Sequence, residues 1–336
     1  MRVRSAPLAC QLLGYLAVAC LVVACLVPLL PTSAGAQAWP TKPVHIVVSS
    51  GAGGTADILA RMVGERLAPL LGQPVVIENR PGAGGHLGAG LVARAEPDGY
   101  TLLMSGSPTH SVGPHLFKRL SYEPMRDVPP VAMVAAAPNL LVVNASLPVK
   151  SLDDLVRLAR EKPGQLTYSS AGNGTSGHLA AELLKSMARI DMRHVPYKSG
   201  PEAVTGVLTG DVSFIFFTVP SLLPQVETGK LRALAITGAA RSQLVANVPT
   251  VAEMGFPGFE VLAWYALFAP RETPKPVVAR LGADIEKIVQ LPDIRDKMIQ
   301  LGAEPRYMSP EQLTAFVAVE SPKWGQLIRE SGGAID

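Results

Sequence analysis

The stretch SSGAGGTADILAR, Ser49–Arg61, decides how the chain around it is interpreted. It follows Val44–Val48, a β-branched run typical of a buried parallel strand. Apolar residues then recur at helical spacing until Gly72, where a C′ glycine belongs. A loop of small residues between a strand and a helix gathers unpaired N–H groups at the positive end of the helix dipole. The stretch therefore predicts a strand–loop–helix unit that can hold an anion.

A second loop of this kind follows the strand-like QLTYSS in the other half of the chain. If the two helix starts face each other across a cleft, they can hold both carboxylates of one small acid, or a carboxylate and a polar group. The candidate ligand-binding residues of the first loop are Ser50, Gly51, Gly53, Gly54, Thr55 and Asp57. Those of the second are Ser170, Ala171, Gly172, Asn173, Gly174, Thr175 and Ser176. Asp57 has two interpretations, a cap on the helix N–H groups or a contact with a ligand ammonium group.

Dinucleotide binding is the alternative interpretation of the first loop. Residues 51–56 fit G-x-G-x-x-A, and Glu78 ends the next strand, where an acid would bind a ribose. The second loop fits G-x-G-x-x-G but has no such acid. Tight packing without any ligand is a third possibility for either loop, since the motif alone has many false matches. No Walker A lysine follows either loop, which argues against phosphoryl transfer.

Catalytic and metal-binding motifs are missing from the sequence. None of the six histidines forms H-E-x-x-H, and there is no G-x-S-x-G elbow. We therefore expect no catalytic residue, no metal ligand and no cofactor. His178 is expected to be packed or solvent-facing, and Trp264 and Tyr265 to wall a cleft or lie in a hinge core.

Strand and helix patterns alternate through the chain, which predicts an α/β fold with mostly parallel sheets flanked by helices. With 336 residues and 48% hydrophobic content, the chain is long enough for two domains. Ser151 opens a helix with a capping-box pattern. The proline-rich DVPPVAMVAAAP is taken as a connection to a strand at Leu140–Val143. Other expected strands are 75–77 and 101–104, and the expected tail helices are 277–289, 294–301 and 310–328.

The first 38 residues have the pattern of a secretory signal. Arg2 and Arg4 precede a long apolar stretch, and Ala36-Gln37-Ala38 is an A-x-A site. We expect export to the periplasm with cleavage after Ala38. An uncleaved anchor, or a lipoprotein attached at Cys25, is the alternative. The net charge of +3 gives no bias toward nucleic acid, and all three cysteines lie in the signal, so the mature chain has none.

The ordered motifs resemble the Bug family of extracytoplasmic solute receptors, the substrate-binding components of tripartite tricarboxylate transporters. The matching stretches include WPTKPVHIVVSSGAGGTADILAR, VVIENRPGAGGHLGA, EPDGYTLLMSGSPTH, LTYSSAGNGTSGHLAAELL and VPTVAEMGFPGFE. The resemblance implies a two-lobed periplasmic-binding-protein fold, type II-like, with a carboxylate in the cleft. It also implies lobe 1 at residues 39–142 plus 264–336 and lobe 2 at 143–263, with crossings near Leu141–Asn144 and Val261–Tyr265.

The resemblance further implies a serine-rich loop in the cleft, which adds Ser105, Ser107 and Thr109 to the candidate site. Tyr197, Lys198 and Phe217 complete the set of candidate ligand-binding residues, and Lys198 can attract an anion. The implied partners are a small organic carboxylate and the membrane subunits of a transporter, which need not be encoded nearby. A monomer is expected.

Two positions depart from the family pattern. Ser49-Ser50 stands where two prolines or Pro-Gly are common, and Phe217 stands where an aspartate would point into the cleft. An aromatic side chain removes a partner for an ammonium group. We therefore expect an aromatic or aliphatic mono- or dicarboxylate rather than an amino acid. The rival functions are an exported NAD(P)-dependent oxidoreductase and a sensor that presents its ligand to a receptor kinase.

Overall fold

The computed structural model describes residues 39–330, and all elements below lie in the compact unit that begins at Lys42. The predicted signal at 1–38, with Cys25, lies outside the described residues. Between residues 39 and 330, no helix has both the length and the apolar composition needed to cross a bilayer.

Three parallel strands form the outer sheet of the first half, in the order β2-β1-β3. They are β1 (Val44–Val48), β2 (Val75–Asn79) and β3 (Thr101–Gly106). Helix α2 (Thr55–Leu71) connects β1 to β2 and ends at Gly72, which has the left-handed conformation expected of a C′ glycine. Helix α3 (His86–Ala93) connects β2 to β3. The strand–loop–helix unit predicted around the first glycine loop is confirmed.

The second half repeats this arrangement. Its parallel strands lie in the order β7-β5-β6, with β5 at Thr167–Ser170, β6 at Arg193–Pro196 and β7 at Phe214–Thr218. Its helices are α6 (Leu152–Glu161), α7 (Ser176–Ala188), α8 (Gly200–Thr209) and α9 (Val219–Glu227). The hydroxyl of Ser151 accepts the Asp154 N–H at 3.1 Å, so the predicted cap of α6 is confirmed.

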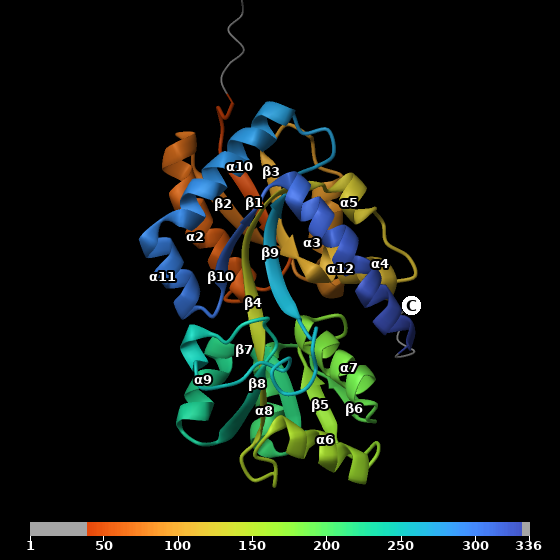
Figure 1. Cartoon of the computed structure of the whole chain (residues 1–336). Coiled ribbons are helices and arrows are strands. Elements are labelled where there is room, and N and C mark those ends of the chain that lie inside the picture. The colour runs from red at the N-terminus through yellow and green to blue at the C-terminus, as the bar shows by residue number, and fades with distance from the viewer. Residues whose placement is uncertain (1–38, 331–336) are drawn as a thin grey trace, which may run out of the picture. The chain divides into compact units, whose positions relative to one another are not determined.

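The 15-residue strand β4 (Pro130–Asn144) runs through both halves (Figure 1). Residues 130–138 pair antiparallel with β9 (Leu262–Phe268), and residues 139–143 pair antiparallel with β7. Two further strands also pair antiparallel with β4: β8 (Leu231–Ile236) and β10 (Glu304–Met308). Strand β4 is thus shared by both halves, and the parallel strand pairs are β2-β1-β3 in one half and β7-β5-β6 in the other. The predicted α/β class is confirmed.

Treating DVPPVAMVAAAP as a connection was wrong. Val131–Ala137 is the first part of β4, and every residue in it is buried. Two prolines suggested a break, but Pro129 precedes the strand and Pro130 opens it, where a missing N–H is tolerated. Both faces of this segment are covered, so it has no polar–apolar alternation that would mark it as a strand.

The change of strand partners shows where β4 passes from one half to the other. Pro138 pairs with Leu262 of β9, and Asn139 pairs with Thr218 of β7. The passage lies at Pro138–Asn139, before the expected crossing at Leu141–Asn144. The return lies next to Val261, whose N–H binds the carbonyl of Thr237, within the expected range. The lobe limits as a whole stay a prediction.

Helix α12 (Pro310–Glu330) packs against the cores of both halves. Leu313 and Val317 belong to a buried cluster with Val47, whereas Trp324 and Leu327 belong to one that surrounds β5. Figure 1 shows it beside α4 (Gly113–Leu116) of the first half and reaching toward α7 of the second, and it also packs against the turn η3 at 108–112. The other helices are α4 (Gly113–Leu116), α5 (Pro124–Asp127), α10 (Lys275–Gln290) and α11 (Pro292–Gln300), with short turns at 83–85, 108–112 (η3) and 243–245.

Candidate functional site

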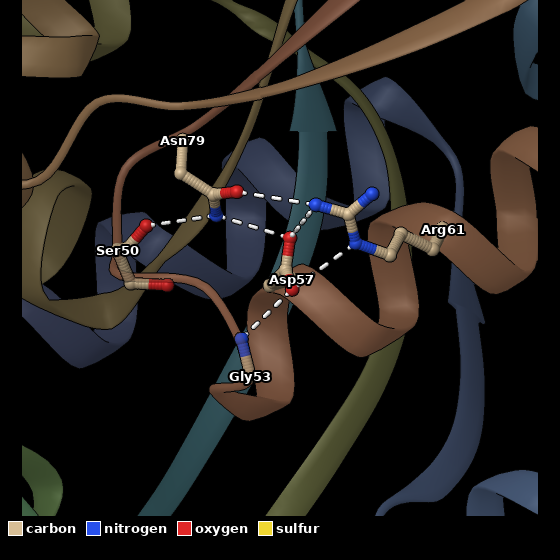
Figure 2. Close-up of polar contacts among 5 residues, drawn as sticks. All are labelled: Ser50, Gly53, Asp57, Arg61 and Asn79. Atoms are coloured by element: carbon tan, nitrogen blue, oxygen red, sulfur yellow. Dashed lines mark hydrogen bonds and ion pairs between the residues drawn. The ribbon is translucent and has the colours of Figure 1, made fainter.

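Asp57 holds the first glycine loop in place (Figure 2). One carboxylate oxygen accepts the Gly53 N–H at 2.9 Å and the Arg61 Nε–H at 3.2 Å. The other accepts from the side-chain amide of Asn79 at 3.0 Å, and the same amide also donates to the Ser50 carbonyl at 3.1 Å. These contacts give Asp57 a structural role in the protein, although the N–H it accepts belongs to Gly53 of the loop and not to the first turn of α2.

The electrostatics of Asp57 agree with this role. Its side chain is buried, and burial alone would raise the pKa of the carboxyl. Hydrogen bonds from Arg61, Gly53 and Asn79 outweigh that effect and hold the pKa below its ordinary value. The group is therefore a carboxylate at neutral pH, and its charge lies at the positive start of α2.

Replacing Asp57 with alanine should lower the free energy of unfolding by about 2 kcal/mol, because it leaves the Gly53 N–H and the Asn79 amide without their acceptor. Urea unfolding at pH 7 measures this change. Asp153→Ala is the control, since Asp153 lies in the first turn of α6 but is exposed. Equal losses in the two variants would contradict a special role for Asp57.

The buried hydroxyl of Ser50 has no hydrogen-bond partner. A buried hydroxyl without a partner costs free energy, so such an atom at a loop tip is a candidate ligand contact. Glu78, the acid that dinucleotide binding would require, is bonded to His45 at 2.7 Å and to Arg80 at 3.2 Å. These partners hold the pKa of Glu78 below its ordinary value. They give the carboxylate a structural role.

A chain of hydrogen bonds leads from the start of the first loop into the core. The hydroxyls of Ser49 and Ser105 lie 2.7 Å apart, those of Ser105 and Thr109 lie 2.6 Å apart, and Thr109 Oγ1 lies 2.8 Å from His110 Nδ1. The other ring nitrogen of His110 donates to the Val128 carbonyl at 3.2 Å. Ser105 and Thr109, both predicted from the serine-rich loop, thus lie next to the first glycine loop.

The second glycine loop is held by His178, His194 and its own hydroxyls. Gly174 N–H donates to His178 Nδ1 at 3.2 Å, and Gly172 N–H donates to Ser170 Oγ at 3.1 Å. The same Ser170 oxygen lies 2.7 Å from His194 Nε2. Gly172 and Gly174 have φ values of 118° and 77°, which other residues rarely adopt. The expectation that His178 is packed rather than a general base agrees with this contact.

The loops also contact the segment between them. Val112 and Leu116, which follow the serine-rich loop, lie directly against Gly174, where a side chain would find no room. The Thr55 side chain lies close enough to the Tyr265 hydroxyl on β9 to affect its pKa, and the Ser176 hydroxyl lies 3.3 Å from Asn139 Oδ1 on β4. Tyr265 pairs with Ala135, four residues before Asn139. The β4 residues nearest these two contacts, Ala135 and Asn139, are about 13 Å apart along the strand.

Several loop N–H groups already have acceptors within the protein. Those of Gly53, Gly54, Gly172, Gly174 and Thr175 donate to Asp57, Gly51, Ser170, His178 and Gly172 respectively. The glycines therefore shape the loops. Because their N–H groups are already bonded within the protein, fewer N–H groups are left for a ligand than the sequence predicted. The first helical hydrogen bonds come from Ile58 and Leu179, so the first-turn N–H groups at 55–57 and 176–178 are the donors that precede them.

The other predicted residues are placed as follows. Ser107 is buried at the start of the turn at 108–112, Ala171 is half-buried, and Gly51, Asn173 and Lys198 are exposed. The Tyr197 ring packs against Gly206 of α8, and the Phe217 ring packs against Gly200 at the start of the same helix.

Asn139 is the site residue that sequence reasoning missed. Its Oδ1 receives Ser176, and its Nδ2 is buried without a partner. Its position as the one amide side chain within the apolar run AAAPNLLVV could have marked it as a candidate site residue. Asn79, Tyr265 and His194 also take part in holding the loops. Across residues 39–330, no group of three His, Cys, Asp or Glu side chains is arranged to hold a metal ion.

Comparison with known proteins identifies the family. A family model described as the tripartite tricarboxylate transporter family receptor matches residues 59–333. The chain belongs to this family. Its members are periplasmic solute-binding receptors and are not enzymes. The predicted resemblance is confirmed.

Curated relatives match over most of their length. A Pseudomonas sp. (strain P51) protein described as UPF0065 protein in tcbD-tcbE intergenic region is 38% identical over 295 residues, 88% of each chain. Protein BugT of Bordetella pertussis is 35% identical over 301 residues, which are 89% of this chain and 92% of BugT.

Solved receptor structures share the fold. R. palustris Rpa4515 with adipate has a TM-score of 0.81 at 36% identity, covering 88% of this chain and 99% of that one. MatC (Rpa3494) from Rhodopseudomonas palustris with bound malate has a TM-score of 0.77 at 34% identity, covering 86% and 100%. Both neighbours are two-lobed periplasmic binding proteins, so the predicted two-lobed fold is confirmed.

Proposed function

We propose that this protein is an exported receptor that binds a small organic carboxylate between its two glycine loops and delivers it to the membrane subunits of a tripartite tricarboxylate transporter. In this proposal the chain forms two lobes close to those expected from the sequence, with the first crossing moved to Pro138–Asn139 of β4 and the second next to Val261. Cleavage after Ala38 would release the receptor into the periplasm. Closure of the lobes on the ligand would give the membrane partner a shape to recognise.

The observation that carries this proposal is a pair of unsatisfied polar atoms, one at each loop. Ser50 Oγ and Asn139 Nδ2 are both buried and lack hydrogen-bond partners. They accompany the first-turn N–H groups of α2 and α7, whose first residues, Thr55 and Ser176, contact the central strands β9 and β4. Two donor-rich helix starts that contact adjacent strands suit the two ends of a short organic acid.

The neighbouring structures support the class of ligand. One holds adipate and the other malate, and both are dicarboxylates. The family supports a receptor over the NAD(P)-dependent oxidoreductase, and the bonds that Glu78 makes to His45 and Arg80 agree.

Ser50→Ala should separate ligand contact from stability. The hydroxyl has no protein partner, so its removal should leave the free energy of unfolding unchanged or slightly higher. Affinity for the ligand should fall about tenfold, the equivalent of one hydrogen bond. Calorimetric titration and urea unfolding measure the two quantities.

Ser151→Ala is the matched control for that variant. It removes the cap of α6 and should cost about 1 kcal/mol of stability without changing affinity. A Ser50→Ala protein that binds as tightly as the wild type would remove Ser50 from the site.

The ligand class is tested by calorimetry against adipate, malate, citrate, terephthalate, nicotinate, aspartate and glutamate, with NAD and NADP as the oxidoreductase arm. Phe217 lacks the carboxylate that an aspartate would offer to an ammonium group, so we expect binding of a dicarboxylate or an aromatic acid. Tight binding of an amino acid alone would reject this preference, and stabilisation by NAD alone would reject the receptor.

A further inference from the structure

A cluster of buried polar and aromatic side chains lies directly behind the second glycine loop. Tyr168 of β5 stacks on both His194 of β6 and His178 of α7, and the two histidine rings are tilted with their centres 4.3 Å apart. The Tyr168 hydroxyl bonds to Glu182, which also pairs with Lys185 at 2.9 Å. The proposed function gives this cluster no role, although two of its members bond directly to the loop.

The bond to Gly174 fixes the protonation state of His178. A backbone N–H can only donate, so His178 Nδ1 must be the acceptor and carries no proton. Burial, with a smaller contribution from Lys185, lowers the pKa of His178 to about 4. Burial also lowers the pKa of His194 to about 3. Both rings are therefore neutral at pH 7.

Gly174 has no side chain of its own to hold it. Its φ of 77° is available to few other residues, and Leu116 fills the space where a side chain would begin. Its N–H points to His178 across one turn of the chain, and its neighbour Gly172 is held through Ser170 and His194. The conformation of the loop therefore depends on acceptors supplied from behind it.

We propose that His178 is a positioning residue for the carboxylate: its neutral Nδ1 holds Gly174 so that the first-turn N–H groups of α7 are presented to the ligand. The inference rests on the proposed function. Without this acceptor, the Gly174 N–H would turn toward solvent or the ligand, and the loop would lose the geometry that β5 and α7 impose.

Two substitutions at His178 distinguish positioning from packing. Asparagine places its Oδ1 close to the position of Nδ1 and can accept the same N–H, whereas leucine has similar bulk and no acceptor. We expect His178→Leu to raise the Kd for adipate, or for the acid of the panel that binds most tightly, about tenfold. His178→Asn should stay within about threefold of the wild type.

Melting temperatures of the same three proteins give the second readout. A purely structural histidine would lower the melting temperature in both variants and leave Kd unchanged or change it equally, and that result would overturn the inference. If the wild type binds no acid of the panel at pH 7, both the proposed function and this inference fail. If it binds and the two variants have equal Kd values, only the inference fails.

Discussion

Replacing Gly177 with alanine should destabilise the protein by about 3 kcal/mol or more, or prevent it from folding. Gly177 lies in the first turn of α7, and an added Cβ would overlap the backbone carbonyl oxygen of Phe216 on β7. A strand carbonyl in the middle of a sheet cannot move aside without breaking its pairing, so the helix must shift instead. The starts of α7 and of the second loop would shift with it.

Gly51→Ala is the matched control, since it makes the same substitution in the other glycine loop. Nothing lies within 4 Å of a Cβ built at Gly51, so its stability should change by less than about 0.5 kcal/mol. Thermal unfolding compares the two, with a fall on the order of 10 °C expected for Gly177→Ala alone. Similar melting temperatures for both variants would show that Gly177 of α7 does not pack against the Phe216 carbonyl of β7 as closely as described.

Replacing His110 with glutamine should cost about 3 kcal/mol at pH 7. The imidazole is buried, stacks on the Phe268 ring with centres 3.7 Å apart, and bonds to both Thr109 and Val128. Glutamine can replace the hydrogen bonds in part but not the stacked ring. Urea unfolding measures the loss, and a loss below about 1 kcal/mol would contradict the packing described.

The same histidine should make the wild type sensitive to acid. Burial lowers the pKa of His110 from 6.5 to about 3, so between these pH values the histidine is protonated in the unfolded chain and neutral in the folded protein. The contribution of neutral His110 to the free energy of unfolding is complete above pH 6.5. It falls by about 1.4 kcal/mol for each pH unit below that value. Between pH 6 and pH 5, the wild type should lose about 1 kcal/mol more than His110→Gln. Equal losses would show that His110 is protonated in the folded state.

The local structure of the site could be predicted from the sequence. The strand before each glycine loop, the helix after it and the C′ glycine at the end of α2 follow from short-range patterns. Such patterns are reliable because they reflect backbone geometry and hydrogen bonding within a few residues. The candidate residues Ser105 and Thr109 could be named because the family motif places them together.

The contacts between distant segments could not be predicted. Asp57 meets Asn79 of the next strand, Ser176 meets Asn139 of β4, and Thr55 meets Tyr265 of β9, across separations of up to about two hundred residues. No short-range period encodes these pairs. They arise because β4 and β9 lie side by side at the centre of the sheet and present their polar side chains to both helix starts.

By itself, the sequence determined that two glycine loops lead from strands into helices and that the chain resembles the receptor family, because loop chemistry and helix periodicity are local. Only the tertiary structure decided which N–H groups remain for a ligand. Asp57, Ser170 and His178 accept hydrogen bonds from the N–H groups of the loop glycines. Ser50 Oγ and Asn139 Nδ2 are buried without hydrogen-bond partners. Hydrogen-bond satisfaction depends on every neighbour in space, and those neighbours are brought together only by folding.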